Sequence, residues 1–265
     1  MKAQLAELVS IDRHILEELK MNGAVIQGVY TSTIHLSLND AIITLGNTIG
    51  VGKHHVIVDR ALSFMDAELV PGLKVLVEHN HLCIGSIQIN IQPGAIHQFD
   101  PYLVVYRLDL QSMDQLKKLR KLVTESRQFQ QFASPDASPH IRFQYEKIDV
   151  FLNSPGLPSA LSILGLGMGL TPLGDDILTG FIMGLNTVGK TLPWISKLIM
   201  EAPRKTSRLS AQNLKDTYDR LYPDLFILFI EGLLKDHDIS HALPVLNLGA
   251  TSGAGILLGF LHGIL

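Results

Sequence analysis

Glycines recur every four residues along two apolar segments of the 265-residue chain, residues 177–188 and 252–265. The glycines at this spacing are Gly180, Gly184, Gly255, Gly259 and Gly263. Residues four apart share one face of an α-helix, and a glycine inside a helix costs about 1 kcal/mol relative to alanine. The pattern therefore predicts two helices that pack against each other backbone to backbone, because small residues permit that approach.

Both predicted helices begin with polar residues. Asp175 and Asp176 precede the first glycine stripe, and Thr251 and Ser252 precede the second. If the two helices pack in parallel, these polar ends meet at one point. Close packing explains the glycines by themselves, whereas the meeting of the polar ends indicates a functional site.

A glycine-rich turn, residues 165–176 with the sequence GLGMGLTPLGDD, leads into the first of these helices. Its glycines permit positive φ angles and let a ligand approach the backbone. Pro172 is favourable in a first helical turn, whose amide N–H groups lack partners within the helix. Such a helix start is typical of an anion-binding site. The spacing matches neither a Walker loop nor the dinucleotide-binding fingerprint.

The paired carboxylates in this turn have two interpretations. Acidic residues in a first helical turn stabilise the helix by roughly 0.3–1 kcal/mol each through its dipole, without any functional role. As functional groups, they would orient a nitrogen nucleophile, accept its proton, or hold Mg²⁺ against a phosphate. We expect Asp176, which lies on the glycine face, to point into the site, and Asp175 to have the structural role.

The first half of the chain has the alternating pattern of β-strands. Residues 34–38 and 41–45, on either side of an Asn-Asp pair, predict two strands joined by a turn. Further strands are expected over residues 55–59, 73–77, 82–91 and 103–110, after a first helix within residues 1–20. The remainder of the sequence has helical periodicity. We predict one helix that begins at Ser112 and five more over residues 177–188, 192–200, 207–221, 225–235 and 252–265.

These patterns predict an α+β fold with a β-rich N-terminal part and a predominantly α-helical C-terminal part. Serine, aspartate and proline crowd residues 133–139 and mark a linker. We therefore expect a β-rich domain with an N-terminal helix over residues 1–135, and a helical domain carrying the glycine-rich turn over residues 136–265.

Composition limits the location and the partners of the chain. The net charge of −3 and the pI near 6.4 give no basic surface for nucleic acid. The single cysteine, Cys83, fits a reducing compartment, and polar residues interrupt the apolar segments 177–200 and 242–265. We expect a soluble cytoplasmic protein without a membrane span. The hydrophobic content of 46% suggests a homo-oligomer or a member of a complex.

Three motifs carry a family resemblance. The sequence GLGMGLTPLGDDILTGF at 165–181, with TSRLSAQNL at 206–214 and GATSGAGILLGF at 249–260, resembles a bacterial family long catalogued as a domain of unknown function. One branch of that family is the third subunit of oxamate carbamoyltransferase, in anaerobic allantoin degradation. In the family, an acidic residue often occupies the position of Gly255.

The resemblance implies a subunit of a carbamoyltransferase-like complex that acts on small anionic amide or ureide metabolites. Asp175 and Asp176 are the catalytic candidates. The substrate-binding candidates are Gly167, Gly169, Thr171, Gly174, Ser207, Arg208, Thr251 and Ser252. The resemblance does not identify a cofactor, and Mg²⁺ is one possibility. The alternative is a non-catalytic subunit that binds a metabolite or regulates a partner chain.

Overall fold

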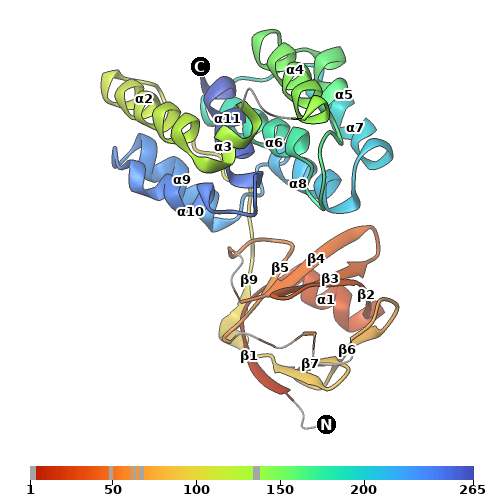
Figure 1. The fold of residues 1–265 in the computed structure, drawn as a ribbon. Coiled ribbons are helices and arrows are strands. Elements are labelled where there is room, and N and C mark those ends of the chain that lie inside the picture. Colours follow the sequence, from red (N-terminus) through yellow and green to blue (C-terminus); the bar gives the residue numbers. More distant parts are fainter. Residues whose placement is uncertain (1–3, 48–49, 61, 63, 66–68, 134–137) are drawn as a thin grey trace. The chain divides into compact units, whose positions relative to one another are not determined.

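The structure is a computed structural model that describes residues 4–47, 50–60, 62, 64–65, 69–133 and 138–265. Contacts divide the chain into two compact units, Met1–Asp100 and Pro101–Leu265 (Figure 1). The first is built mainly of strands and the second of helices, which confirms the predicted α+β fold.

The first unit is a closed β-sheet with one α-helix. Its elements are β1 (Gln4–Asp12), α1 (Arg13–Asn22), β2 (Ala24–Val29), β3 (Thr33–Leu38), β4 (Ala41–Gly46), β5 (His55–Val58), β6 (Lys74–Glu78), β7 (His81–Ile84), β8 (Ile87–Asn90), the 3₁₀ turn η1 (Pro93–Ala95) and β9 (Ile96–His97). The strand order is β5-β4-β3-β2-β6-β7-β8-β1-β9, and β5 also pairs with β1. This extra pairing closes the sheet into a barrel and so removes the open edges of β1 and β5.

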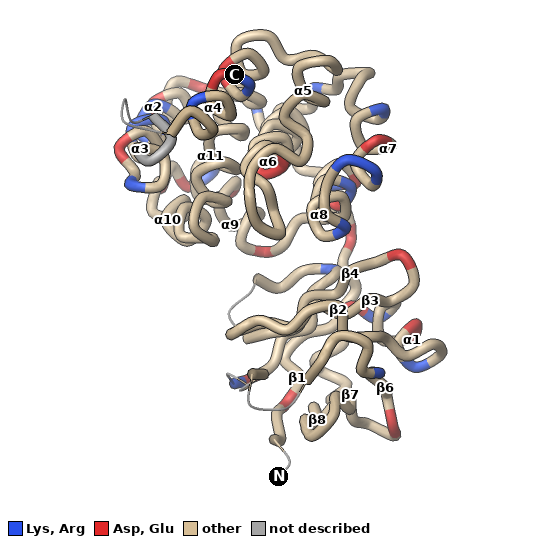
Figure 2. Tube along the Cα trace, turned by 45° about the vertical axis from the view of Figure 1, so that its right-hand side comes forward, with Lys and Arg blue, Asp and Glu red and all other residues tan. Residues whose placement is uncertain are grey.

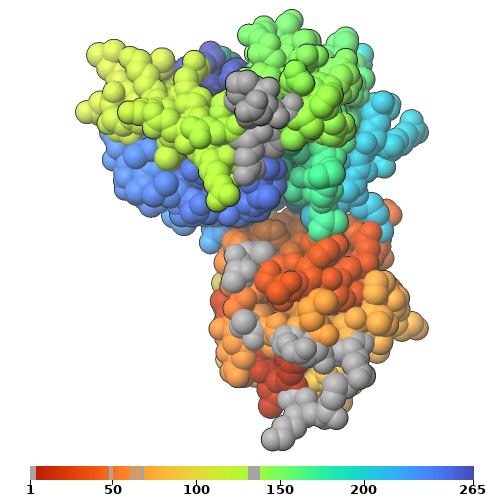
Figure 3. All heavy atoms as spheres, in the orientation of Figure 1, coloured from red at the N-terminus to blue at the C-terminus, as the bar shows by residue number. Residues whose placement is uncertain are grey.

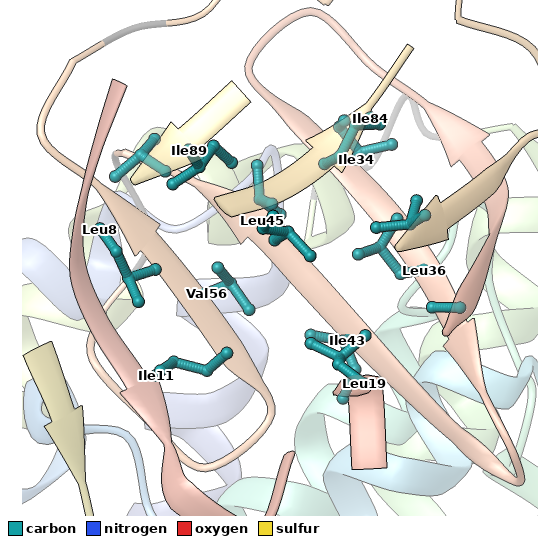
Figure 4. Packing of buried hydrophobic residues seen from close by; sticks show 14 of the residues in the cluster. Leu8, Ile11, Leu19, Ile34, Leu36, Ile43, Leu45, Val56, Ile84 and Ile89 are labelled. Carbon is teal, nitrogen blue, oxygen red and sulfur yellow. The ribbon is translucent and has the colours of Figure 1, made fainter. Parts of the chain in front are cut away.

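Alternate side chains of the strands fill the interior of this barrel. Ile34 and Leu36 of β3 and Ile43 and Leu45 of β4 are fully buried, and Leu19 of α1 joins them in one cluster (Figure 4). The two-residue period of a strand places these side chains on the same face. The alternation of polar and apolar residues in the sequence therefore indicates which face of the sheet is buried.

Several predicted strands are confirmed and three assignments are corrected. Strands β3 and β4 follow the prediction, and Asn39 in their connecting turn has a positive φ of 51°. Residues 82–91 form two strands instead of one, because Gly85 at φ 56° turns the chain between β7 and β8. The first helix is shorter than expected, since residues 4–12 form β1. Residues 103–109 contain no strand.

The second unit is helical. Its elements are α2 (Leu110–Glu125), α3 (Arg127–Ala133), α4 (Pro139–Asn153), α5 (Leu157–Ile163), α6 (Leu173–Thr187), α7 (Ile195–Lys205), α8 (Arg208–Tyr218), α9 (Asp224–Leu234), the 3₁₀ turn η2 (Ile239–His241), α10 (Ala242–Leu246) and α11 (Ser252–Ile264). Helix α2 begins before Ser112, with Asp109 as its N-cap. Among the described residues, no helix is both long enough and apolar enough to cross a membrane.

Helices α6 and α11 form the centre of this unit, and the other helices surround them (Figure 1). A Cβ atom at Gly180 would lie 1.9 Å from the carbonyl oxygen of Ile256, and one at Gly259 would lie 2.0 Å from that of Ile177. The helices thus touch through their backbones at both glycine stripes. The predicted glycine packing is confirmed.

Helix α2 belongs to the helical unit. It packs on α9 and α11, and Figure 3 shows its atoms against those of the C-terminal helices. The sequence-based boundary between residues 135 and 136 and most of the predicted linker 133–139 lie outside the described residues, which leave out 134–137. That boundary stays a prediction, while the contacts of the described residues separate the units after Asp100.

Candidate functional site

The two glycine-striped helices run in the same direction. Gly255, Gly259 and Gly263 of α11 lie opposite successively later residues of α6: a Cβ at these positions would be 3.1 Å from Cβ of Asp176, 2.0 Å from O of Ile177 and 2.1 Å from O of Phe181. The helices are therefore parallel, and their N-terminal ends lie together.

A hydrogen bond joins these two helix starts. Thr171, just before α6, and Ser252, the first residue of α11, have their hydroxyl oxygens 3.0 Å apart. Thr251 is the N-cap of α11 but makes no capping hydrogen bond with its side chain. The structure thus brings together the polar ends that the sequence placed at the heads of the two stripes.

A third helix start meets the glycine-rich turn. Ser207 is the N-cap of α8, and its hydroxyl accepts from N of Ser210 at 3.0 Å and donates to the carbonyl oxygen of Leu170 at 2.5 Å. The hydroxyl of Ser210 lies 3.4 Å from the same carbonyl. Arg208, the first residue of α8, is exposed. Three positive helix ends therefore surround residues 170 and 171.

Asp175 joins the glycine-rich turn to the start of α8 through hydrogen bonds. Its carboxylate accepts from the amide of Gly165 at 2.7 Å and from the hydroxyl of Thr206, and its side chain is buried. Burial raises the pKa of Asp175, while the hydrogen bonds from Thr206 and Gly165 act in the opposite direction. Asp175 thus links the beginning of the turn to the segment before α8, which is a structural task.

Asp176 has a different environment. Its side chain is 5% exposed, and its Oδ2 atom is buried without a hydrogen-bond partner among the described residues. Figure 2 shows acidic residues on α6, inside the helical unit. Burial raises the pKa of Asp176 well above its usual value, the hydroxyl of Ser252 lowers it, and the neighbouring Asp175 raises it further.

The glycines of the turn have two distinct functions. Gly167 and Gly169 have φ angles of 126° and 97°, which favour glycine, and a Cβ at Gly169 would meet no atom of the described residues within 4 Å. Gly174 is different, because its Cβ would lie 1.9 Å from O of Ile163. Gly174 therefore permits close packing, whereas Gly169 lies on open surface.

The amides at the start of α6 correct one expectation. The N–H of Gly174 donates to O of Leu166 at 2.8 Å, and those of Asp175 and Asp176 donate to O of Pro172 at 2.9 and 3.1 Å. These three groups are therefore not open to a ligand. Within the described part of the chain, the amides of residues 167–171 donate no hydrogen bond. The unpaired donors thus lie in the turn, just before the helix.

An apolar pocket lies beside this site, between α3, α4, α6 and α11, and its roughly 310 Å³ of space includes open solvent. Its lining residues are Phe129, Tyr145, Ile148, Leu173, Ile177, Ala254, Gly255 and Leu258. An anion finds neither a cation nor an amide donor among these side chains, so this pocket is not the expected anion pocket. Among the described residues, no three histidine, cysteine or acidic side chains are placed to hold a metal ion.

The raised pKa of Asp176 predicts how stability depends on pH. The folded state holds this proton more tightly than the unfolded state, so the contribution is present below the usual value of 3.8 and is lost as pH rises through the folded pKa. Relative to Asp176→Asn, we expect the wild type to lose up to about 1.4 kcal/mol of unfolding free energy per pH unit in this interval. Urea unfolding of both proteins over a series of pH values measures this difference in unfolding free energy. Parallel pH profiles for the two proteins would contradict the expectation.

Comparison with known proteins gives one family. Residues 163–264 match the family model described as oxamate carbamoyltransferase subunit AllH, which covers less than half of the chain. A search of curated proteins and a search of solved structures give no match. The matched segment contains the glycine-rich turn and all of α6, α8 and α11. The resemblance expected from the motifs is thus confirmed: residues 163–264 are similar to the oxamate carbamoyltransferase subunit AllH.

Proposed function

We propose that this chain is a subunit of a carbamoyltransferase-like enzyme complex that acts on small anionic amide or ureide metabolites. The observation that carries the proposal is the family match, which begins two residues before the glycine-rich turn and ends within α11. The matched residues therefore include every helix start that meets at the turn. The cytoplasm is the compartment in which such a metabolic enzyme would act.

We place the anion site at the glycine-rich turn. Three helix N-termini direct partial positive charge toward residues 170 and 171, and each such end favours an anion by roughly 0.3–1 kcal/mol. The amides of residues 167–171 have no other partners among the described residues, and the exposed Gly169 lets a ligand reach them. Arg208 adds a full positive charge at the start of α8.

The candidate residues divide into groups in this proposal. Gly167, Gly169, Thr171 and Ser252 would contact the ligand directly, with Ser207, Arg208 and Thr251 at the rim. Gly174 would act through packing. Asp176 would face the ligand as the catalytic candidate, and Asp175 would hold the turn in place.

A non-catalytic metabolite-binding or regulatory subunit is the second candidate. It is favoured by two pairs of polar groups that are already engaged with each other, the carboxylate of Asp175 with the hydroxyl of Thr206 and the hydroxyls of Thr171 and Ser252. In that case the same turn binds the anion, but the reacting groups belong to other subunits. Activity of the complex separates the two candidates, whereas binding does not.

The test is calorimetric titration of oxamate, carbamoyl phosphate and inorganic phosphate into the chain alone and into its complex with partner subunits. We expect binding in at least one setting. Ser252→Ala should weaken it about tenfold, since one hydrogen bond near a charge is worth about 1.4 kcal/mol. The matched control is Ser162→Ala, because Ser162 is exposed on α5 and, among the described residues, donates only to O of Ser159.

Three results would count against the proposed site. The first is that none of the three anions binds in either setting. The second is that Ser252→Ala and Ser162→Ala bind as tightly as the wild type. The third is that both variants lose binding equally, which would indicate an effect unrelated to the turn. A loss of activity in Ser252→Ala that exceeds its loss of affinity would favour a catalytic role over simple binding.

A further inference from the structure

One carboxyl group in the helical unit lacks the partners that a buried charge needs. Asp176 is 5% exposed, and its Oδ2 atom makes no hydrogen bond within the described residues. An ionised carboxylate in that position would forgo hydrogen bonds that water supplies, at a cost of several kcal/mol. Asp175, by contrast, receives hydrogen bonds from Gly165 and Thr206.

The surroundings of Asp176 offer a negative charge one stabilising contact. From α11 it faces Gly255, which has no side chain, and Ser252, whose hydroxyl lowers the pKa of Asp176 through a hydrogen bond and also lies 3.0 Å from the hydroxyl of Thr171. The titratable neighbour on its own helix is Asp175, whose negative charge opposes ionisation of Asp176. Burial acts in the same direction and is the larger cause of the raised pKa.

We propose that Asp176 carries a proton and donates it, in a hydrogen bond, to an acceptor oxygen of the bound ligand. The ligand class is then a small molecule with a carboxylate or amide oxygen, and the contact requires neither a cation nor an amine donor. This inference rests on the proposed function, because it assigns the chemistry of the same anion site. It assigns Asp176 a different role from the proton acceptor or Mg²⁺ ligand suggested by the sequence.

A protonated Asp176 also removes an electrostatic conflict. Two adjacent carboxylates would repel an anion at the turn, whereas a neutral carboxyl group adds a donor to those of the amides in residues 167–171. A neutral carboxyl is a weak ligand for Mg²⁺, which prefers charged oxygen donors. Added Mg²⁺ or a chelator should therefore leave the affinity for oxamate unchanged.

The first test needs no ligand. Infrared difference spectroscopy of wild type against Asp176→Asn, at neutral pH, should reveal the C=O stretching band of a protonated carboxylic acid that only the wild type possesses. Addition of oxamate to the wild type, with the partner subunits present, should shift this band as the new hydrogen bond forms. Absence of the band overturns the inference, even if oxamate binds.

The second test measures oxamate affinity against pH. The wild type should bind equally well at low pH, and its affinity should fall by up to tenfold per pH unit as pH rises through the pKa of Asp176. Asp176→Asn, which keeps an N–H donor, should bind within about threefold of the wild type without this decline. Asp176→Ala, which has no donor, should bind about 10- to 100-fold more weakly.

The outcomes separate this inference from the proposed function. If Asp176→Asn loses affinity as severely as Asp176→Ala, or if affinity of the wild type rises with pH, the carboxylate is ionised and the inference is wrong. If the infrared band is present but neither oxamate nor carbamoyl phosphate binds, the proposed function fails, and with it the ligand assigned here. Thermal melting of both variants shows whether weaker binding merely reflects unfolding.

Discussion

Alanine in place of Gly180 or Gly259 is expected to destabilise the helical unit by about 3 kcal/mol or more, although alanine is the better helix former. The substitution gains roughly 1 kcal/mol in helix propensity. Against this, the new Cβ would lie 1.9 Å from O of Ile256 in one variant and 2.0 Å from O of Ile177 in the other. Overpacking usually costs 1–3 kcal/mol, and here the obstacle is backbone, which cannot rotate away.

The chain provides its own reporter and control for this experiment. Its only tryptophan, Trp194, stacks on Phe181 of α6 with ring centroids 6.1 Å apart, so its fluorescence follows unfolding of the helical unit. The control is Gly156→Ala, where the nearest described atom to a new Cβ would be Cδ of Pro158 at 3.9 Å. Because Gly156 is the N-cap of α5, its substitution by alanine should lower the free energy of unfolding by no more than about 1 kcal/mol.

The glycine variants also connect stability to the site. Both substitutions would separate α6 from α11, and the hydrogen bond between Thr171 and Ser252 depends on that contact. We therefore expect loss of oxamate binding at temperatures where the variants remain folded. Unchanged urea midpoints in both variants would show that the helices can separate without cost, and the common site of the two helix starts would lose its basis.

Much of the helical core could be predicted because the sequence encodes its geometry directly. A glycine every fourth residue is costly in an isolated helix, so the stripes at Gly180 and Gly259 identify a contact face without any structure. The parallel direction did not follow from the stripes alone. It is set by the long connection from α6 to α11, which includes α7, α8, α9 and α10.

The strands were harder to predict where the sequence pattern fits two different secondary structures. In residues 82–91 the alternation continues through a turn at Gly85, so the period of two cannot reveal the break. In residues 4–12 charged and apolar residues fit a helical stripe as well as a strand. Pairing of β1 with β5 and β8 decides for the strand, and pairing over such sequence distances leaves no local trace.

The candidate site was predictable in its parts but not in its connections. The glycines, Asp175 and Asp176 were evident as a motif, and Ser207 as the first residue of a predicted helix. The carbonyl of Leu170, which receives the hydroxyls of Ser207 and Ser210, carries no signal in the sequence, since every residue has such a group. The unpaired Oδ2 of Asp176 likewise results from the absence of a neighbour among the described residues, and the sequence does not show which groups surround a side chain.

Replacement of Asp175 by alanine is expected to have the largest effect of any single polar substitution in the turn. It would leave the amide of Gly165 and the hydroxyl of Thr206 without their acceptor in a partly buried place. A buried unsatisfied donor costs roughly 1–3 kcal/mol, and partial burial puts each of these two at the lower end, so the expected loss of unfolding free energy is about 2 kcal/mol. Asp175→Asn should cost less, because its amide oxygen can still accept one of the two hydrogen bonds.

A first-turn aspartate elsewhere separates this anchoring from the helix dipole. Asp224 begins α9 and is exposed, so Asp224→Ala should cost only the roughly 0.3–1 kcal/mol that a first-turn acid contributes. Urea unfolding followed by Trp194 fluorescence compares the two variants. Equal losses would mean that Asp175 acts through the dipole alone. A much larger loss for Asp175→Ala, with oxamate binding weakened at least tenfold, would show that the bond to Thr206 holds the turn over α8 in the geometry that the anion site requires.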